Sequence, residues 1–351
     1  MPSFWETALF SERDDGLRLV SPYGGTLPSA NPSAVPRTES LFEPVRDRYG
    51  WRLALVFGNH APGGYCPYYA GELCNHCDIG AGEGAAFNLA TNRERLAWFE
   101  AYYKRYLGSL NHLVLYNSGS ILNPRELPTE VLDEIIAFAN SLPALSAISL
   151  DSREAHIKRT ALRRLLQNAR AELAMRPILG IESADDRIRN TLLRKQMSRA
   201  GIERVYRELS QLADEFGRSR IGLDVNIVIA APGTSDESLI GDAVTTARFA
   251  LTAGAKHGVP VDLNLHPYYP SARGLVEFPD HPRCSLRTTA EAARRIAELA
   301  QSMNADTNLF IGWNDEGHDT DRPEREHERK QFAGAVDMFN HTNDVRSLSG
   351  L

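Results

Sequence analysis

The sequence predicts an α/β protein: a partial (β/α)6 barrel, similar to a TIM barrel, with an N-terminal extension and a C-terminal segment. From Trp51 onward, apolar runs with the length of buried strands alternate with patterns of helical period. The chain has 351 residues, of which 42% are hydrophobic, and this suits the core of a single α/β barrel. We therefore expect an extension over residues 1–50, a barrel core over 51–305, and a C-terminal segment over 306–351 that covers the barrel mouth.

Residues 1–50 are rich in proline, serine and glycine, and four prolines interrupt any regular period: Pro22, Pro28, Pro32 and Pro36. We interpret this stretch as an extension that lies over the core. Six apolar runs of the buried-strand type follow it, at residues 53–57, 112–116, 147–150, 178–181, 223–229 and 261–265. Continuous apolar runs are typical of parallel strands covered on both faces, so these six are expected to form one parallel sheet.

Helical patterns separate the predicted strands. One apolar face comprises Leu96, Phe99, Tyr103 and Tyr106, and another comprises Ile202, Val205, Leu209, Leu212 and Phe216. Ser198 is expected to cap the start of the second of these helices. Thr288, followed by Glu291, forms a capping-box pattern that predicts a last helix over about residues 289–303.

The composition argues against some classes of protein. No apolar stretch reaches the ~20 residues of a membrane span, and the first residues lack the basic and then apolar pattern of a secretory leader. The formal net charge of -6 argues against a surface that binds a polyanion such as nucleic acid unaided. We therefore expect a cytoplasmic enzyme with no membrane partner.

Three of the four cysteines lie close together in the sequence. Cys66, Cys74 and Cys77 form a C-x7-C-x2-C pattern just after the first predicted strand. Three thiolates in one loop can hold a [4Fe-4S] cluster while its fourth iron stays open to a substrate or cofactor. The pattern leaves two alternatives open, a zinc site completed by His60 or His76 and thiols that bind no metal. A disulfide framework is not expected in a chain of this length with so few cysteines.

Polar residues stand at the ends of the predicted strands. They are Asn117, Ser118, Gly119 and Ser120 after the second strand, Asp151 and Arg153 after the third, Glu182 after the fourth, Asn226 in the fifth, and His266 and Tyr268 at the end of the sixth. Each residue alone suits a helix cap or a turn equally well. Because the loops after parallel strands converge on one mouth, the group as a whole predicts a functional site there.

With these residues in view, the chain resembles the radical S-adenosylmethionine (SAM) superfamily. The likeness covers roughly residues 50–320 and rests on the cysteine loop, the six β-α units, and Asn-Ser-Gly-Ser, Asp-Ser-Arg-Glu and Gly-Ile-Glu-Ser at successive strand ends. Within the superfamily the chain is most similar to the branch that contains the Elongator catalytic subunit and the radical lyase subunit of archaeosine synthase. It departs from the common pattern where Asn117-Ser118-Gly119 replaces Gly-Gly-Glu and where His76 replaces an aromatic residue.

The resemblance implies two cofactors and the residues that hold them. Cys66, Cys74 and Cys77 would bind a [4Fe-4S] cluster, and SAM would bind its open iron. Lys195 or Arg194 would bind the methionine carboxylate of SAM. The other implied SAM-binding residues are Asn117, Ser118, Gly119, Ser120, Asp151, Arg153, Glu182 and Asn226. An electron donor such as flavodoxin or ferredoxin would reduce the cluster.

The resemblance further implies a lyase or transferase, and the acidic net charge favours a small metabolite as its substrate. The candidate catalytic residues are His266, Tyr268, Arg153 and Cys284, and the lone thiol of Cys284 suits a thiophilic substrate such as trivalent arsenic. Other residues expected at the mouth are Tyr68, Tyr69, His76, Tyr269, Arg273, Asn314, Asp315 and Glu316. Two alternatives stay open, a tRNA-modifying enzyme as in the related branch and a non-catalytic zinc or iron-sulfur protein.

Overall fold

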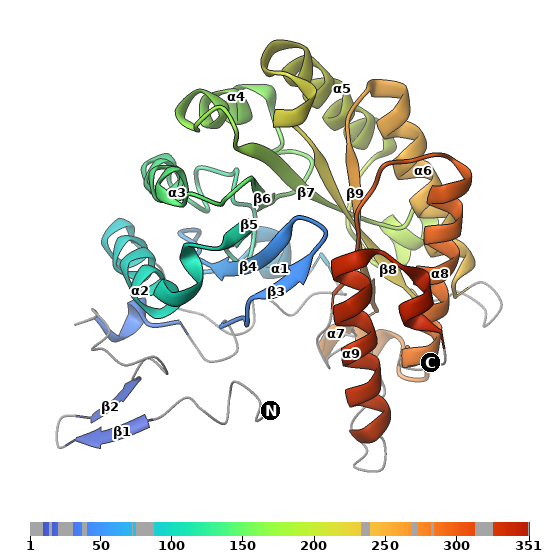
Figure 1. Cartoon of the computed structure of the whole chain (residues 1–351), viewed down its shortest axis with the longest axis horizontal. Coiled ribbons are helices and arrows are strands. Elements are labelled where there is room, and N and C mark those ends of the chain that lie inside the picture. The colour runs from blue at the N-terminus through green and yellow to red at the C-terminus, as the bar shows by residue number, and fades with distance from the viewer. Residues whose placement is uncertain are drawn as a thin grey trace.

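A curved eight-stranded sheet forms the centre of the molecule, and helices cover its outer face (Figure 1). The structure is a computed structural model that describes residues 10–13, 16–19, 31–36, 41–71, 73–74, 88–232, 239–268, 272–281, 284–312, 326–349 and 351. Within these ranges no helix is long and apolar enough to cross a membrane.

Seven parallel strands and one antiparallel edge strand make up the sheet, in the order β10-β9-β8-β7-β6-β5-β4-β3. The strands are β3 (Val45–Asp47), β4 (Gly50–Val56), β5 (Leu110–Tyr116), β6 (Ala147–Asp151), β7 (Ala174–Glu182), β8 (Leu223–Ile229), β9 (Val261–Pro267) and β10 (Leu309–Ile311). β1 (Phe10–Arg13) and β2 (Gly16–Leu19) pair in a separate hairpin. Because β4 to β10 are parallel, their carboxyl ends meet at one mouth.

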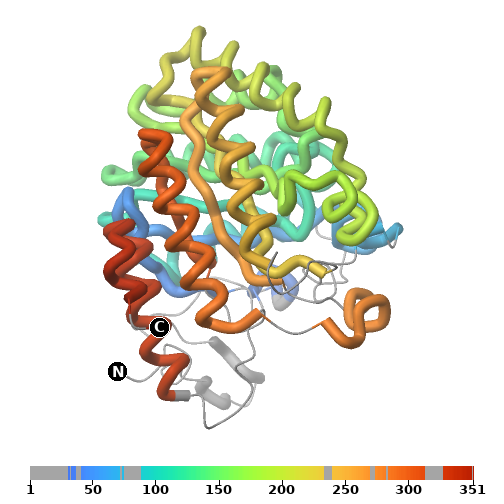
Figure 2. Tube along the Cα trace, turned by 90° about the vertical axis from the view of Figure 1, so that its right-hand side faces the viewer, coloured from blue at the N-terminus to red at the C-terminus, as the bar shows by residue number. Residues whose placement is uncertain are grey.

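Helices connect the parallel strands and lie outside them. The α-helices are α1 (Pro67–Ala70), α2 (Leu89–Leu107), α3 (Thr129–Ser141), α4 (Arg159–Asn168), α5 (Arg199–Phe216), α6 (Gly241–His257), α7 (Ala272–Glu277), α8 (Leu286–Ser302) and α9 (Glu326–Thr342). Short 3-10 helices are η2 (Pro32–Ala34), η6 (Arg218–Arg220) and η9 (Val345–Leu348), and η5 (Arg187–Leu192) is a π-helix. Figure 2 shows α6 and α8 side by side along the outside of the sheet.

The two faces of the sheet differ in polarity. Residues that point outward, such as Leu113 and Leu115 on β5, pack with Trp98 and Ile135 of the covering helices in the main apolar core. Alternate residues point inward and many of them are polar, since successive strand residues face opposite sides. The barrel therefore has an apolar wall and a polar interior.

A buried polar cluster fills the amino-terminal end of this interior, and we call it the floor network. Its members are Asp47, Tyr49, Arg52, His112, Ser149, Arg176, Asp224 and Asp262. Nδ1 of His112 lies 2.7 Å from Asp47, and Nε2 lies 2.7 Å from Oγ of Ser149. Ser149 in turn donates to Asp224. Each ring nitrogen of His112 thus has a hydrogen-bond partner, Asp47 for Nδ1 and Ser149 for Nε2.

The carboxylates of the floor network lie beside basic side chains. Arg176 lies between two carboxylates, 2.7 Å from Asp224 and 2.7 Å from Asp262. Burial works against its charge, but Asp262 and Asp224 hold the pKa of Arg176 above its ordinary value. Burial likewise opposes ionisation of Asp47, and the His112 ring beside it holds the pKa of Asp47 below its ordinary value. Each of the three carboxylates thus lies beside at least one basic side chain: Asp47 beside His112 and Arg52, and Asp224 and Asp262 beside Arg176.

The C-terminal helix α9 covers the open edge of the sheet. Asn343 accepts from the backbone N–H of Leu309 at 2.8 Å and donates to its carbonyl at 2.9 Å. Asn340 does the same for Ile311, at 2.8 Å and 3.0 Å. Side chains also join the two edges of the sheet, since the guanidinium of Arg52 lies 3.9 Å from the ring centroid of Phe310. The sheet is therefore a nearly closed barrel.

Each of the six predicted strand segments is a strand, but the sheet is larger than predicted because β3 and β10 extend it. Ser198 caps α5 as predicted, with its side chain accepting from the N–H of Gly201. The predicted cap at Thr288 is wrong, because Ser285 caps α8 and accepts from the N–H of Thr288. The predicted mouth-covering role of residues 306–351 depends on residues 313–325, which lie outside the described residues, so it stays a prediction.

Candidate functional site

The first cysteine lies at the mouth of the barrel, in the loop after β4. Cys66 precedes α1, and its backbone N–H donates to the carbonyl of Ser118 at 2.9 Å, which joins this loop to the one after β5. The thiol is half-buried, and burial raises its pKa; Glu126 and Cys74 add to this effect. A metal that binds a thiol displaces its proton. In the absence of a metal, the raised pKa keeps Cys66 in its thiol form.

The second cysteine, Cys74, is buried with 8% of its surface exposed, and cations surround it. Nη1 of Arg153 lies 3.6 Å from its sulfur. The same guanidinium stacks on Tyr68, 3.6 Å from the ring centroid, and its Nη2 donates to the carbonyl of Lys195. Arg153 thus joins α1, Cys74 and the segment after η5.

A buried ion pair lies beside the cysteines. Nζ of Lys195 lies 2.7 Å from Oε1 of Glu182, and both side chains are about 10% exposed or less. Burial alone would lower the pKa of Lys195, but Glu182, helped by Cys74, raises it above its ordinary value. Gly180 makes room for this pair, because a Cβ there would lie 2.4 Å from Glu182 and 2.7 Å from Lys195.

The neighbouring cation, Arg194, has a different position. Its side chain is 48% exposed and pairs with Glu277 of α7 at 2.8 Å. Of the two cations predicted as alternatives for a ligand carboxylate, Lys195 faces the interior and Arg194 faces solvent. Lys195 is therefore better placed than Arg194 to meet a ligand carboxylate inside the barrel, and its binding role stays a prediction.

The loop after β5 is organised by a buried carboxylate that sequence reasoning missed. Glu126 accepts from Asn59 at 3.1 Å, from the N–H of Ser120 at 3.0 Å and from Asn123 at 2.6 Å. Gly119 is required here, because a Cβ would lie 1.8 Å from Oε2 of Glu126. In the sequence, Glu126 stands in a polar stretch before a helix, which is typical of an exposed turn, so no signal marked it.

At the mouth, one residue at or just after the end of each of three strands adopts the left-handed backbone conformation. They are Ser118 after β5 (φ 55°), Glu182 at the end of β7 (φ 62°) and Ala230 after β8 (φ 58°). A side chain in this conformation costs about 1–2 kcal/mol, and such strain gathers at functional sites. The strain lies at the carboxyl ends of three strands, where the sequence predicted a site.

Asp151, at the end of β6, is a partly buried acid near the same ion pair. Burial raises its pKa to about 7, with Glu182 and Glu126 contributing and Lys195 and Arg153 opposing. At neutral pH its carboxyl is therefore divided between its protonated and ionised forms. It is the mouth group best suited to take up or release a proton.

Asn117 is fully buried, and neither its amide nitrogen nor its carbonyl oxygen has a hydrogen-bond partner within the described residues. A buried unpaired amide is unfavourable in the absence of a ligand. Further along the interior, Asn226 accepts from Asn264 at 3.0 Å. The pKa of His266 is lowered by burial. Of Asn117, Asn226 and His266, Asn117 is the residue whose side-chain polar atoms are buried without a hydrogen-bond partner among the described residues.

Two predicted catalytic residues are packed in apolar surroundings. Tyr268 is 2% exposed, lies in a small apolar cluster with Val228 and Leu193, and its ring meets that of His281 edge to face at 5.3 Å. Cys284 is 3% exposed in the main core, and burial raises the pKa of its thiol to about 11. Its sulfur lies 3.4 Å from the hydroxyl of Thr289. These surroundings do not favour a reactive thiolate at Cys284.

Several predicted residues lie outside the described residues: Cys77, His76, Tyr269, Asn314, Asp315 and Glu316. Within the described part of the chain, no group of three or more His, Cys, Asp or Glu side chains is arranged to hold a metal ion. The donor chemistry nevertheless fits an iron-sulfur cluster. Cys66 and Cys74 bring soft sulfur donors to one mouth, and Cys77 follows close behind in the sequence.

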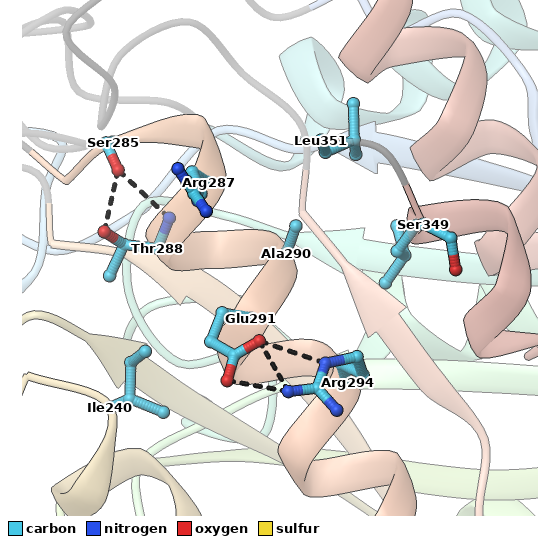
Figure 3. A pocket seen from close by; sticks show the side chains of 10 residues that line it. Ile240, Ser285, Arg287, Thr288, Ala290, Glu291, Arg294, Ser349 and Leu351 are labelled. Carbon is cyan, nitrogen blue, oxygen red and sulfur yellow. Dashed lines mark hydrogen bonds and ion pairs between the residues drawn. The ribbon is translucent and has the colours of Figure 1, made fainter.

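Two hollows lie away from the interior of the barrel. One of about 670 Å³ is formed by the start of α8 and the C-terminal residues (Figure 3), where Glu291 and Arg294 already pair at 2.8 Å. The other, of about 640 Å³, lies between the start of α4 and the middle of α5. Its lining includes Lys158, Arg159, Arg204 and Arg207. We do not assign the reaction to either, because neither includes the cysteines or the Glu182–Lys195 pair.

Comparisons with known proteins leave the family open. The chain matches no protein-family model and no curated protein. Among solved structures it is similar to a radical S-adenosylmethionine methyltransferase, TsrM, from Kitasatospora setae, with tryptophan substrate and the SAM analogue aza-SAM bound. The sequence identity is 14%, the TM-score is 0.37, and the match covers 62% of this chain but 36% of that one. A similarity of this size does not establish a common fold, so the proposal below rests on the residues of this chain.

Proposed function

We propose that this protein is a radical SAM enzyme that acts on a small metabolite. In this proposal Cys66, Cys74 and Cys77 hold a [4Fe-4S] cluster at the mouth of the barrel. One observation carries the proposal. Two of these cysteines, Cys66 and Cys74, lie close to the buried Glu182–Lys195 pair at the carboxyl ends of parallel strands. A structural zinc site would not call for this pair or for strained backbone beside it.

The groups at the mouth match the parts of SAM. Its methionine end carries a carboxylate and an ammonium, and its ribose carries hydroxyls. Lys195 supplies a cation for the carboxylate, and Glu182 supplies an acceptor for hydroxyls once the pair rearranges around the ligand. Asn117 can donate to one polar group and accept from another, which would satisfy an amide that is otherwise unpaired.

When bound, such a cluster would supply the one electron that cleaves a carbon-sulfur bond of SAM. The protein orients the sulfonium nucleoside and excludes water from it, which prevents side reactions of a carbon radical. Asp151, with a pKa of about 7, holds or releases a proton at the mouth of the barrel. Cys284 is left out of this proposal, because its buried and hydrogen-bonded thiol gives no support to a thiophilic substrate such as arsenic.

The decisive experiment is anaerobic reconstitution with iron and sulfide, followed by dithionite and SAM. We expect a brown protein with acid-labile sulfide and a SAM-derived nucleoside among the products. 5'-Deoxyadenosine would indicate a transferable hydrogen atom, and methylthioadenosine would indicate transfer of the aminocarboxypropyl group. A colourless protein that binds zinc stoichiometrically would instead support a non-catalytic metal site.

A tRNA substrate is the second candidate, and the basic hollow between α4 and α5 favours it. Lys158, Arg159, Arg204 and Arg207 line this hollow, and Arg204 donates to the carbonyl of Glu154 in the loop after β6. Phosphates are the natural partners of such a surface. Nucleoside release that depends on added tRNA, and that falls steeply with salt, would favour this candidate over a small metabolite.

A further inference from the structure

We propose that Arg153 sets the reduction potential of the metal centre by donating to the sulfur of Cys74. This inference rests on the proposed function, since it concerns the cluster that the cysteines would hold. Nη1 of Arg153 lies 3.6 Å from Sγ of Cys74, within hydrogen-bonding range for sulfur. Hydrogen bonds to the sulfurs and nearby charge are among the factors that set the potential of an iron-sulfur cluster.

The guanidinium is held in place by two contacts, and the backbone of Arg153 is fixed as well. Cζ lies 3.6 Å from the ring centroid of Tyr68 and Nη2 donates to the carbonyl of Lys195, while the backbone N–H donates to Oγ of Ser120 at 3.2 Å. A planar group with five donors can make these contacts and still direct one N–H to sulfur. The position of Arg153 is therefore fixed by the fold before any cluster binds.

Two cations, Arg153 and Lys195, lie near Cys74, and a carboxylate neutralises the charge of Arg153 less than that of Lys195. Lys195 pairs with Glu182 at 2.7 Å, a full charge-assisted hydrogen bond. The carboxylate that faces Arg153 is Glu154, whose Oε2 lies 3.9 Å from Nε, beyond hydrogen-bonding distance. In a buried setting a cation at this position stabilises added negative charge. It favours the reduced cluster, which carries one electron more.

Arg153 is thus a positioning residue that acts through Cys74, and its removal should make the cluster harder to reduce. The test compares wild type, Arg153→Met and Lys158→Met after anaerobic reconstitution, with the midpoint potential followed by EPR-monitored titration. We expect the ratio of reduced to oxidised cluster at a fixed potential to fall about tenfold in Arg153→Met, which is ~59 mV for a one-electron couple. Lys158→Met removes an exposed cation a few residues further along the same loop and should leave the midpoint unchanged.

Two outcomes overturn this inference. One is an Arg153→Met protein with wild-type iron content and a wild-type midpoint. The second outcome concerns Tyr68→Ala, which keeps Arg153 but removes the ring beneath it and is measured if Arg153→Met binds no cluster. We expect a lowered midpoint potential in Tyr68→Ala, and an unchanged midpoint potential overturns the inference. A wild-type protein that binds no cluster at all would refute the proposed function itself, so the two failures are distinguishable.

Discussion

Both ends of the barrel interior are polar, but the polar groups are paired with one another at the amino-terminal floor and are left partly unpaired at the mouth. In the floor network each carboxylate has a basic side chain or a hydroxyl donor beside it. At the mouth, Asn117 has no hydrogen-bond partner among the described residues, Ser118, Glu182 and Ala230 are strained, and the pKa of Asp151 is raised. Charged groups that satisfy one another stabilise a fold, whereas groups left unsatisfied are available to a ligand.

The largest expected effect concerns the mouth. Replacing Cys66, Cys74 or Cys77 with alanine should abolish cluster binding, because the remaining thiolates cannot hold a cubane with one open iron. Iron and sulfide analysis after reconstitution measures this effect. Cys284→Ala is the matched control and should keep its iron, since its sulfur contacts Thr289 in the core. Full iron content in the Cys74→Ala protein would contradict the comparison.

The floor network should respond in stability and not in metal content. Arg176→Met leaves Asp224 and Asp262 buried without their cation, and removing one partner of a buried pair costs about 3–5 kcal/mol. Urea unfolding of the metal-free protein measures the change. Arg164→Met is the control, because its pair with Asp133 is more than one-third exposed on both sides and should contribute about 0–1 kcal/mol. Equal losses in the two variants would remove the distinction between the floor and the surface.

A pH series sharpens the comparison further. The folded protein keeps the proton of Asp151 up to about pH 7, whereas the unfolded chain releases it near the ordinary value of 3.8. Stability is therefore lost as the pH rises through this window. Asp151→Asn lacks this proton, so its free energy of unfolding relative to wild type should increase from about pH 4 to about pH 7 and then level off.

Asp47 should show the opposite trend, since its pKa is lowered. Its contribution is present above its ordinary pKa and is lost as the pH falls through the value in the folded state. Parallel stability curves for wild type, Asp151→Asn and Asp47→Asn would show that neither carboxyl is perturbed.

The smallest expected effect comes from Asn117→Leu, which replaces an unpaired buried amide with an apolar group of similar size. The free energy of unfolding should stay the same or rise by about 1–3 kcal/mol, because a buried unsatisfied group is removed. Affinity for SAM, measured by calorimetry on the reconstituted protein, should fall about tenfold. A variant that is clearly less stable would mean that Asn117 serves the fold and not a ligand.

The sequence predicted the strands well because their burial is periodic and local. Runs such as residues 223–229 are covered on both faces, so the apolar pattern alone identifies them. It missed β10, because three residues are too few to show a period, and it placed the α8 cap at Thr288 because both Ser285 and Thr288 are good caps. Choosing between two such residues depends on where the preceding chain turns.

For the site, the sequence identified residue types at strand ends but not their partners. It could not separate Lys195 from Arg194, since adjacent residues point in different directions only once the segment after η5 is folded. The roles of Glu126 and Gly180 depend on side chains far away in the sequence. Glu126 accepts from Asn59, and Gly180 leaves room for Lys195. Such contacts depend on tertiary packing, for which one sequence without relatives has no signal.

The pairing of α9 with β10 also has a consequence for how the molecule behaves in solution. A free strand edge offers alternating N–H and C=O groups on which another chain can add a strand and start aggregation. Asn340 and Asn343 fill both hydrogen-bonding positions of Ile311 and Leu309, as a neighbouring strand would. The side-chain amides of Asn340 and Asn343 thus block this edge against pairing with another chain. A chain that ends before residue 326 would lack both amides, and we expect it to polymerise through the edge of β10.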